Sequence, residues 1–289
     1  MLQAFNFNNW WIMTEKDNEK SNNNGKRRVL IIISVLLIIC GLSIFVFQAY
    51  NRIAAKNEDE KISSVATTVA SSGTQKTAFS QTENGYFDKM QQELDAVREN
   101  NGEAYSWIYV PDTNVNYPIC QSAVDDEFYL RHSSVDQSWI ASGAIYTESC
   151  NTKTFDDRVT VIYGHNGYSD SMFTSLHKFE DSDFFSSSEH EYFYIYTSAG
   201  KKLKYQVISA FKYDDRHIMN SFDFQNNQVF ESFIEMIKNP SSANKNVRKE
   251  LDKEITVNDN IAVLSTCITN QKSNRYLVCG VLVENEETN

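Results

Sequence analysis

The chain has 289 residues, 41% of them hydrophobic and 13% aromatic, which is enough to bury a core in one large domain or two small ones. Its formal net charge of −11 argues against nucleic acid as a partner. Ten Gly and three Pro exclude a collagen-like or Pro-rich chain. The five cysteines form an odd set without a CxxC pair, which argues against a zinc site and a complete disulfide framework, so we expect no metal and no cofactor.

The clearest physical signal is an uncharged stretch near the N-terminus, VLIIISVLLIICGLSIFVF at 29–47. As a helix it would span roughly 28 Å, close to the hydrocarbon thickness of a bilayer. It is longer than the apolar core of a signal peptide, and no convincing small-residue cleavage site follows. The stretch therefore predicts a transmembrane helix, since a buried core helix is rarely apolar on every face.

Three basic residues, Lys26, Arg27 and Arg28, precede this stretch directly. Positive charge stays on the cytoplasmic side, so residues 1–28 are predicted to be cytoplasmic and everything after the helix extracellular. The apolar opening MLQAFNFNNWWIM leaves two possibilities, a start at Met13 or a patch on the membrane surface.

A folded domain is expected over 85–289, after a linker over 48–84 that is rich in Ser, Thr, Ala, Lys and Glu. Helical spacing of apolar residues predicts an opening helix at 86–100 and a second helix at 227–238, which ends near Pro240. Short β-branched and aromatic runs predict eight strands, at 106–110, 115–120, 143–147, 158–164, 191–197, 202–213, 260–266 and 275–283. These elements favour a mostly β fold, a closed or nearly closed eight-stranded barrel with the second helix inserted between strands six and seven.

Three residues at the ends of predicted strands are candidates for nucleophilic catalysis. Cys267 ends one apolar run, Arg275 opens the next, and His165 follows a strand within a Gly-His-Asn-Gly turn. A cysteine nucleophile needs a base or a cationic neighbour, and these three could meet at one rim of the barrel. Taken singly, each has a plainer interpretation: a buried small hydrophobe for the cysteine, and a structural or surface residue for the histidine and the arginine.

The flanking sequences resemble a class B sortase. LSTC at 264–267, Arg275 at the start of the next strand and YGHN at 163–166 carry the resemblance. SWIYVPDTNVNYPICQSAVDDEFYL at 106–130, SGAIYTES at 142–149 and GHNGYSDSMFTSLHKF at 164–179 extend it over nearly the whole domain. The helix at 227–238 fits the class B insertion.

The resemblance implies a cysteine transpeptidase on the outer face of a Gram-positive membrane. Such an enzyme cleaves a sorting signal of the Asn-Pro-x-Thr type in a secreted protein after the Thr. It holds the protein as a thioester on Cys267 and passes it to an amine of lipid II or the cell-wall peptide. His165 would exchange protons and Arg275 would act as an electrostatic clamp.

The resemblance also implies a substrate groove, with two departures. Some relatives carry Asp two residues after the cysteine, where this chain has Thr269, so no residue is assigned to orient His165. Asp126 stands where the family often has Asn, and Leu130 would form the pocket for the proline. The remaining groove candidates are Tyr163, Ser265 and Thr266. Each of the five has a plainer interpretation: helix surface or core for Asp126 and Leu130, core for Tyr163, and strand filling for Ser265 and Thr266.

Three functions from different classes remain open at this point. The first is a catalytic sortase, which anchors proteins to the wall or assembles pili. The second is a catalytically idle extracellular barrel for adhesion or ligand binding, and the third is a secreted cysteine protease that releases peptides to water. Labelling of Cys267 separates the first two, and products formed with an added amine separate transpeptidation from proteolysis.

Overall fold

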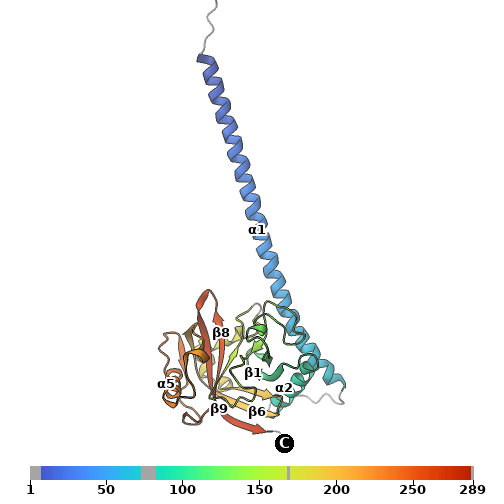
Figure 1. Ribbon diagram of the computed structural model, residues 1–289, viewed down its shortest axis with the longest axis vertical. Helices are drawn as coiled ribbons and strands as arrows, with labels where there is room; N and C mark the ends of the chain where they lie inside the picture. Colours follow the sequence, from blue (N-terminus) through green and yellow to red (C-terminus); the bar gives the residue numbers. More distant parts are fainter. Residues whose placement is uncertain (1–7, 73–82, 168–169, 288–289) are drawn as a thin grey trace, which may run out of the picture. The chain divides into compact units, whose positions relative to one another are not determined.

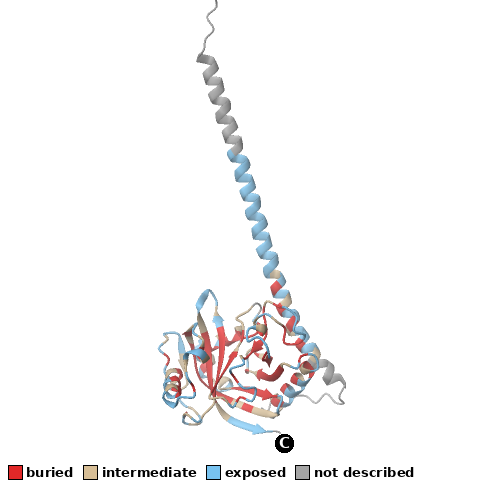
Figure 2. Ribbon diagram, viewed as in Figure 1, coloured by how far each residue is buried: buried red, intermediate tan, exposed pale blue. Residues whose placement is uncertain are grey.

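The computed structural model of the chain describes residues 8–72, 83–167 and 170–287, which belong to two units, Met1–Tyr50 and Asn51–Asn289. Helix α1 (Asn8–Ser72) begins in the first unit and continues into the second. Within it, Lys26–Val65 contains a window with a mean hydropathy of 3.2, long and apolar enough to cross a membrane. The side chains at 26–47 are exposed (Figure 2), so this helix fits the single-pass anchor expected at 29–47.

The second part of α1 differs from the linker expected over 48–84, because it is helical as far as Ser72 and residues 51–62 contact the folded domain. Ala55 and Ile62 are buried. The Ser133 hydroxyl donates to Glu58 Oε1 at 2.6 Å, and the Tyr117 hydroxyl donates to Asp59 Oδ1 at 3.0 Å. The polar composition concealed this contact, because few apolar residues carry it, Ala55, Ile62 and the partly buried Val65.

The second unit is built around a closed barrel of eight strands. Figure 1 labels four of them, β1, β6, β8 and β9. The ring order is β5-β1-β2-β3-β4-β8-β9-β6, and β6 closes it by pairing with β5. The strands of the ring are β1 (Ala104–Tyr109), β2 (Asn116–Cys120), β3 (Ile145–Tyr146), β4 (Val159–Tyr163), β5 (Tyr192–Thr197), β6 (Lys201–Asp214), β8 (Ile261–Ile268) and β9 (Gln271–Glu287). The predicted fold class is therefore confirmed.

Helices and one extra strand complete the unit. Helix α2 (Glu83–Arg98) precedes the barrel and α5 (Asn227–Lys238) lies between β6 and β7 (Lys245–Val247), so the inserted helix is confirmed. The prediction missed β7, a three-residue strand that pairs with β6. It also missed the short helices η1 (Phe128–Leu130), η2 (Thr174–Glu180), α3 (Ser182–Ser186), η3 (Ser188–His190) and α4 (Ile218–Ser221).

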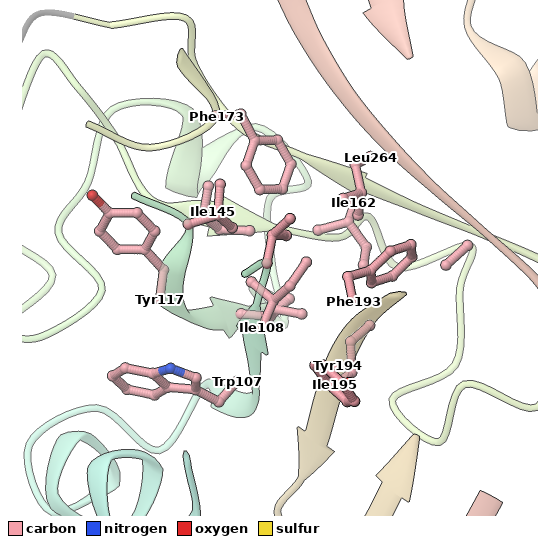
Figure 3. Close-up of a cluster of buried hydrophobic side chains, with 14 of the residues drawn as sticks. Trp107, Ile108, Tyr117, Ile145, Ile162, Phe173, Phe193, Tyr194, Ile195 and Leu264 are labelled. Carbon is pink, nitrogen blue, oxygen red and sulfur yellow. The ribbon is translucent and has the colours of Figure 1, made fainter. Parts of the chain in front are cut away.

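Two apolar clusters stabilise the barrel. One fills its interior, where side chains such as Ile108, Ile162 and Leu264 converge from β1, β4 and β8 (Figure 3). The other lies outside the barrel, where Phe230, Phe233, Ile234 and Ile237 of α5 pack against β4, β6, β8 and β9. Successive side chains of a strand point to opposite faces, so β4, β8 and β9 are buried on both faces under α5.

Candidate active site

The candidate catalytic residues lie on the outer face of the barrel. On β8, Ile261 and Val263 belong to the outer cluster, whereas Ala262 and Leu264 belong to the inner one. The two-residue period therefore places Cys267 on the outer face, and it is exposed because it lies beyond the part of the strand that is buried. Cys267 is thus presented by the end of a strand whose preceding residues on the same face are buried, and not by a loop.

Cys267 and Arg275 are direct partners across the β8–β9 ladder. Side chains of directly opposite residues lie on one face, about 4.5–5.5 Å apart at Cβ. Strand β9 begins at Gln271, four residues before the predicted start, so Arg275 lies within the strand. Its Nη1 donates to the carbonyls of Lys272 and Asn274 at 3.0 and 3.1 Å, which ties the guanidinium to the backbone of its own strand.

His165 reaches the same place from the end of β4. Strand β4 pairs in parallel with β8, with Tyr163 opposite Ser265, and the chain turns two residues later. The His165 Nε2–H donates to the Leu130 carbonyl at 2.8 Å, which leaves Nδ1 as the nitrogen for proton exchange. Burial lowers the pKa of His165 below 6.5, so its imidazole is neutral near pH 7.

A pocket of about 200 Å³ joins the three residues. Its floor is the outer face of β4, β8 and β9, and Tyr146 of β3 also lines it. The rest of the lining comes mainly from the end of β6, with Tyr213, and from the segment after it, with Asp215, Arg216, His217 and Ile218. Sequence reasoning missed this wall, because these residues form no motif of their own.

Four of the five expected groove residues line the pocket, and the fifth, Asp126, does not. Leu130, Tyr163, Ser265 and Thr266 line the pocket, although Thr266 lies on the inner strand face opposite Tyr276. Asp126 is not among the lining residues. Its carboxylate accepts from the backbone N–H of Ser149 at 2.6 Å, so it holds the loop after β3.

An acidic residue supports the wall of the pocket. The His217 Nε2–H donates to Glu148 Oε2 at 2.6 Å, while His217 Nδ1 accepts from the Asn220 backbone N–H at 3.2 Å. Burial and the nearby Glu148 carboxylate raise the pKa values of Tyr146 and Tyr163 well above 10, so both hydroxyls stay protonated. The pocket therefore presents neutral phenols and a fixed imidazole to a ligand.

One group of potential metal ligands occurs in the described part of the chain, formed by Asp112, Glu189 and His190. Both nitrogens of the His190 ring already have partners, the Phe184 carbonyl at 2.8 Å and Asp112 Oδ2 at 3.0 Å. The two acidic residues are exposed and none of the three lines the pocket. We assign no metal to this group.

A thiol beside an arginine, with a neutral histidine on the same pocket of a closed barrel, is an arrangement typical of cysteine-dependent acyl transfer. Residues 108–283 match the family model of the sortase domain. This match covers more than half of the chain, which therefore belongs to the sortase family, a family of cysteine transpeptidases.

Relatives place the chain in class B. It is 28% identical over 197 residues to sortase B of Listeria monocytogenes, covering 68% of this chain and 76% of that protein. The structure of sortase B from B. anthracis in complex with AAEK1 is similar at a TM-score of 0.60 and 26% identity, covering 80% of this chain and 98% of that one. A Streptococcus pyogenes class B sortase involved in pilus biogenesis is similar at 0.55 and 26%, covering 65% of this chain and 97% of that one.

Proposed function

We propose that the chain is a membrane-anchored transpeptidase that cleaves sorting signals of the Asn-Pro-x-Thr type in secreted proteins and joins them to a cell-wall amine. The observation that carries the proposal is the direct pairing of Cys267 with Arg275 on one strand face, with His165 on the same pocket. A structural cysteine would gain nothing from an exposed position beside a fixed guanidinium.

The proposed acylation step follows from the protonation of the groups. The neutral His165 accepts the thiol proton of Cys267, and the resulting thiolate attacks the carbonyl carbon of the Thr. Arg275 stabilises the charge that develops on the carbonyl oxygen. When the C–N bond breaks, the His165 imidazolium gives its proton to the leaving amine, and a thioester remains on Cys267.

The second step returns the enzyme to its starting state. An amine of lipid II or of the cell-wall peptide attacks the thioester, and His165 accepts the proton that this nitrogen loses. The C–S bond breaks and Cys267 leaves as a thiolate, which recovers the proton from His165. Similarity to a class B sortase involved in pilus biogenesis favours a lysine amine of a pilin as a second candidate acceptor.

Mass spectrometry of the full-length protein tests this function. With an Asn-Pro-x-Thr-type peptide and an added amine, we expect an acyl group on Cys267 and an amide product, both absent in Cys267→Ala. Cys150→Ala is the matched control, because Cys150 is also exposed but burial and Glu148 raise its pKa to about 11. Acid as the sole product at saturating amine would identify a protease instead, and an acyl group on another residue would refute the assignment of Cys267.

The proposed location has its own test. The basic residues before 29–47 support a cytoplasmic N-terminus and a barrel outside the membrane. Protease added to intact protoplasts should remove the barrel, and a protected barrel would reverse the orientation.

A further inference from the structure

Two side chains outside the β8–β9 hairpin hold the backbone of Cys267. Asn166 Nδ2 donates to the Cys267 carbonyl at 3.0 Å and to Thr269 Oγ1 at 3.1 Å. His177 Nε2 lies 3.0 Å from the same carbonyl oxygen. Pairing in the hairpin becomes irregular between Cys267 and Ile268, so these bonds fix the peptide where the ladder does not.

The partners of the His177 ring decide its protonation. Nδ1 lies 2.6 Å from Glu180 Oε1, and both a carboxylate and a carbonyl only accept hydrogen bonds. The two contacts are therefore made together only when both ring nitrogens carry a proton, as in imidazolium. His217 differs, because its Nδ1 accepts from a backbone N–H and a neutral ring satisfies both of its contacts.

The surroundings of the ring favour this charged form. The His177 ring stacks on Tyr276 with centroids 5.0 Å apart, within the range of a cation–π contact. Among the described residues, Glu180 and Lys178 from η2 and Asp170 from the preceding loop share its surface pocket. Its neighbours in the β8–β9 hairpin, Thr269 in the turn and Tyr276 on β9, are uncharged. A neutral ring could accept instead from Asn166 Nδ2, 3.2 Å from Nε2, but would then release the Cys267 carbonyl.

We propose that His177 is a positioning residue for the nucleophile: as an imidazolium bound to Glu180, it holds the Cys267 carbonyl together with Asn166. The inference rests on the proposed role of Cys267 in acylation. His177 lies outside the substrate pocket, in a separate surface pocket behind the cysteine. It therefore acts on the geometry of attack and leaves peptide binding unchanged.

The consequence is a loss of turnover without a loss of affinity. A misplacement of about 1 Å at a reacting atom costs roughly 100-fold in rate. Removing one of two bonds to the Cys267 carbonyl should therefore lower kcat for acylation by about 10- to 100-fold, with KM unchanged.

Two substitutions at one position separate hydrogen bonding from packing. His177→Phe keeps a ring stacked on Tyr276 and removes both donors, whereas His177→Gln loses the ring and keeps an N–H close to the position of Nε2. Single-turnover acylation of the full-length protein in detergent micelles should decrease in the order wild type, Gln variant, Phe variant.

His190→Phe is the matched control. The His190 nitrogens also face a carbonyl and a carboxylate, and its ring stacks on Phe184 with centroids 3.6 Å apart, but it contacts neither Cys267 nor the pocket. We expect wild-type acylation from this variant. Three results would each overturn the positioning role. The first is an equal loss of acylation rate in His190→Phe, and the second is a wild-type kcat in His177→Phe. The third is faster acylation by His177→Phe than by His177→Gln.

A spectrum of the unmodified chain gives a second measurement that does not depend on the folding of a variant. With ¹⁵N-labelled histidine, the ring nitrogens of His177 should both be protonated at neutral pH, whereas those of His217 should show one proton, on Nε2. A single proton on the His177 ring would overturn the imidazolium. Failure of the wild type to form an acyl-enzyme would instead refute the proposed function and the inference with it, so the two failures are distinguishable.

Discussion

Gly164, the residue before His165, offers a sharp test of how the strand end positions the histidine. A Cβ at this position would lie 2.5 Å from Ile145 Cδ1 and 2.6 Å from two ring carbons of Phe173. Carbon atoms in contact prefer about 3.5–4.0 Å, so an overlap of about 1 Å must be relieved against buried side chains. Overpacking of this kind costs about 1–3 kcal/mol.

The backbone around Gly164 leaves little room for relief. The Gly164 N–H donates to the Ser265 carbonyl at 3.1 Å, and the Phe173 N–H donates to the His165 carbonyl at 3.0 Å. We therefore expect Gly164→Ala to shift the His165 ring as well as to destabilise the barrel. A displacement of about 1 Å predicts a loss of roughly 100-fold in acylation.

Thermal unfolding and single-turnover acylation of the full-length protein check both parts. A destabilisation of 1–3 kcal/mol should lower Tm by about 2–12 °C for a domain of this size. Gly102→Ala is the matched control, because a Cβ there meets no atom within 4 Å. If Gly164→Ala kept both the Tm and the acylation rate of that control, the tight packing behind His165 would not position the ring.

Three further predictions concern the pocket. Arg275→Ala should lower turnover by about 100- to 1,000-fold, with partial rescue by Arg275→Lys, which lacks the planar fork; a folded variant with wild-type turnover would make the arginine structural. Leu130→Ala should weaken the use of Pro-containing signals roughly 10-fold or more while a thiol reagent still labels Cys267; equal loss of both would indicate misfolding. Because burial lowers the pKa of His165, the neutral base persists to lower pH, and the acid limb of the kcat/KM profile should have its midpoint below 6.5; a midpoint at or above 6.5 would contradict this assignment.

Local patterns of the sequence predicted the barrel well. Each of the eight expected strands is a short apolar or alternating run, and each has its counterpart in the ring. The strand at 143–147 is reduced to Ile145–Tyr146, because it pairs with β4 at only one position. The three-residue β7 is too short to show a period, so no local pattern could reveal it.

Contacts between segments far apart in the sequence could not be predicted from local patterns. His177 and Cys267 are 90 residues apart, and nothing in SLHKFED distinguishes a ring bonded to the strand of Cys267 from one on a solvated helix. The same holds for α1, where Glu58 and Asp59 look like linker residues until Ser133 and Tyr117 are brought beside them. A resemblance to a family supplies its motif residues, but not contacts that depend on side chains outside the motif.

The face of β8 explains why a core pattern ends in a reactive residue. Ile261, Val263, Ser265 and Cys267 share one face, and the outer cluster that includes the α5 side chains contains only the first two of them. The strand is thereby held rigid by packing on both faces over residues 261–264, and the thiol lies beyond this packed region. A nucleophile on such a strand moves less than one on a loop, which is what attack on a carbonyl at a fixed angle requires. The pairing to Arg275 and the bonds to the Cys267 carbonyl then constrain a residue that lies beyond the cluster formed with α5.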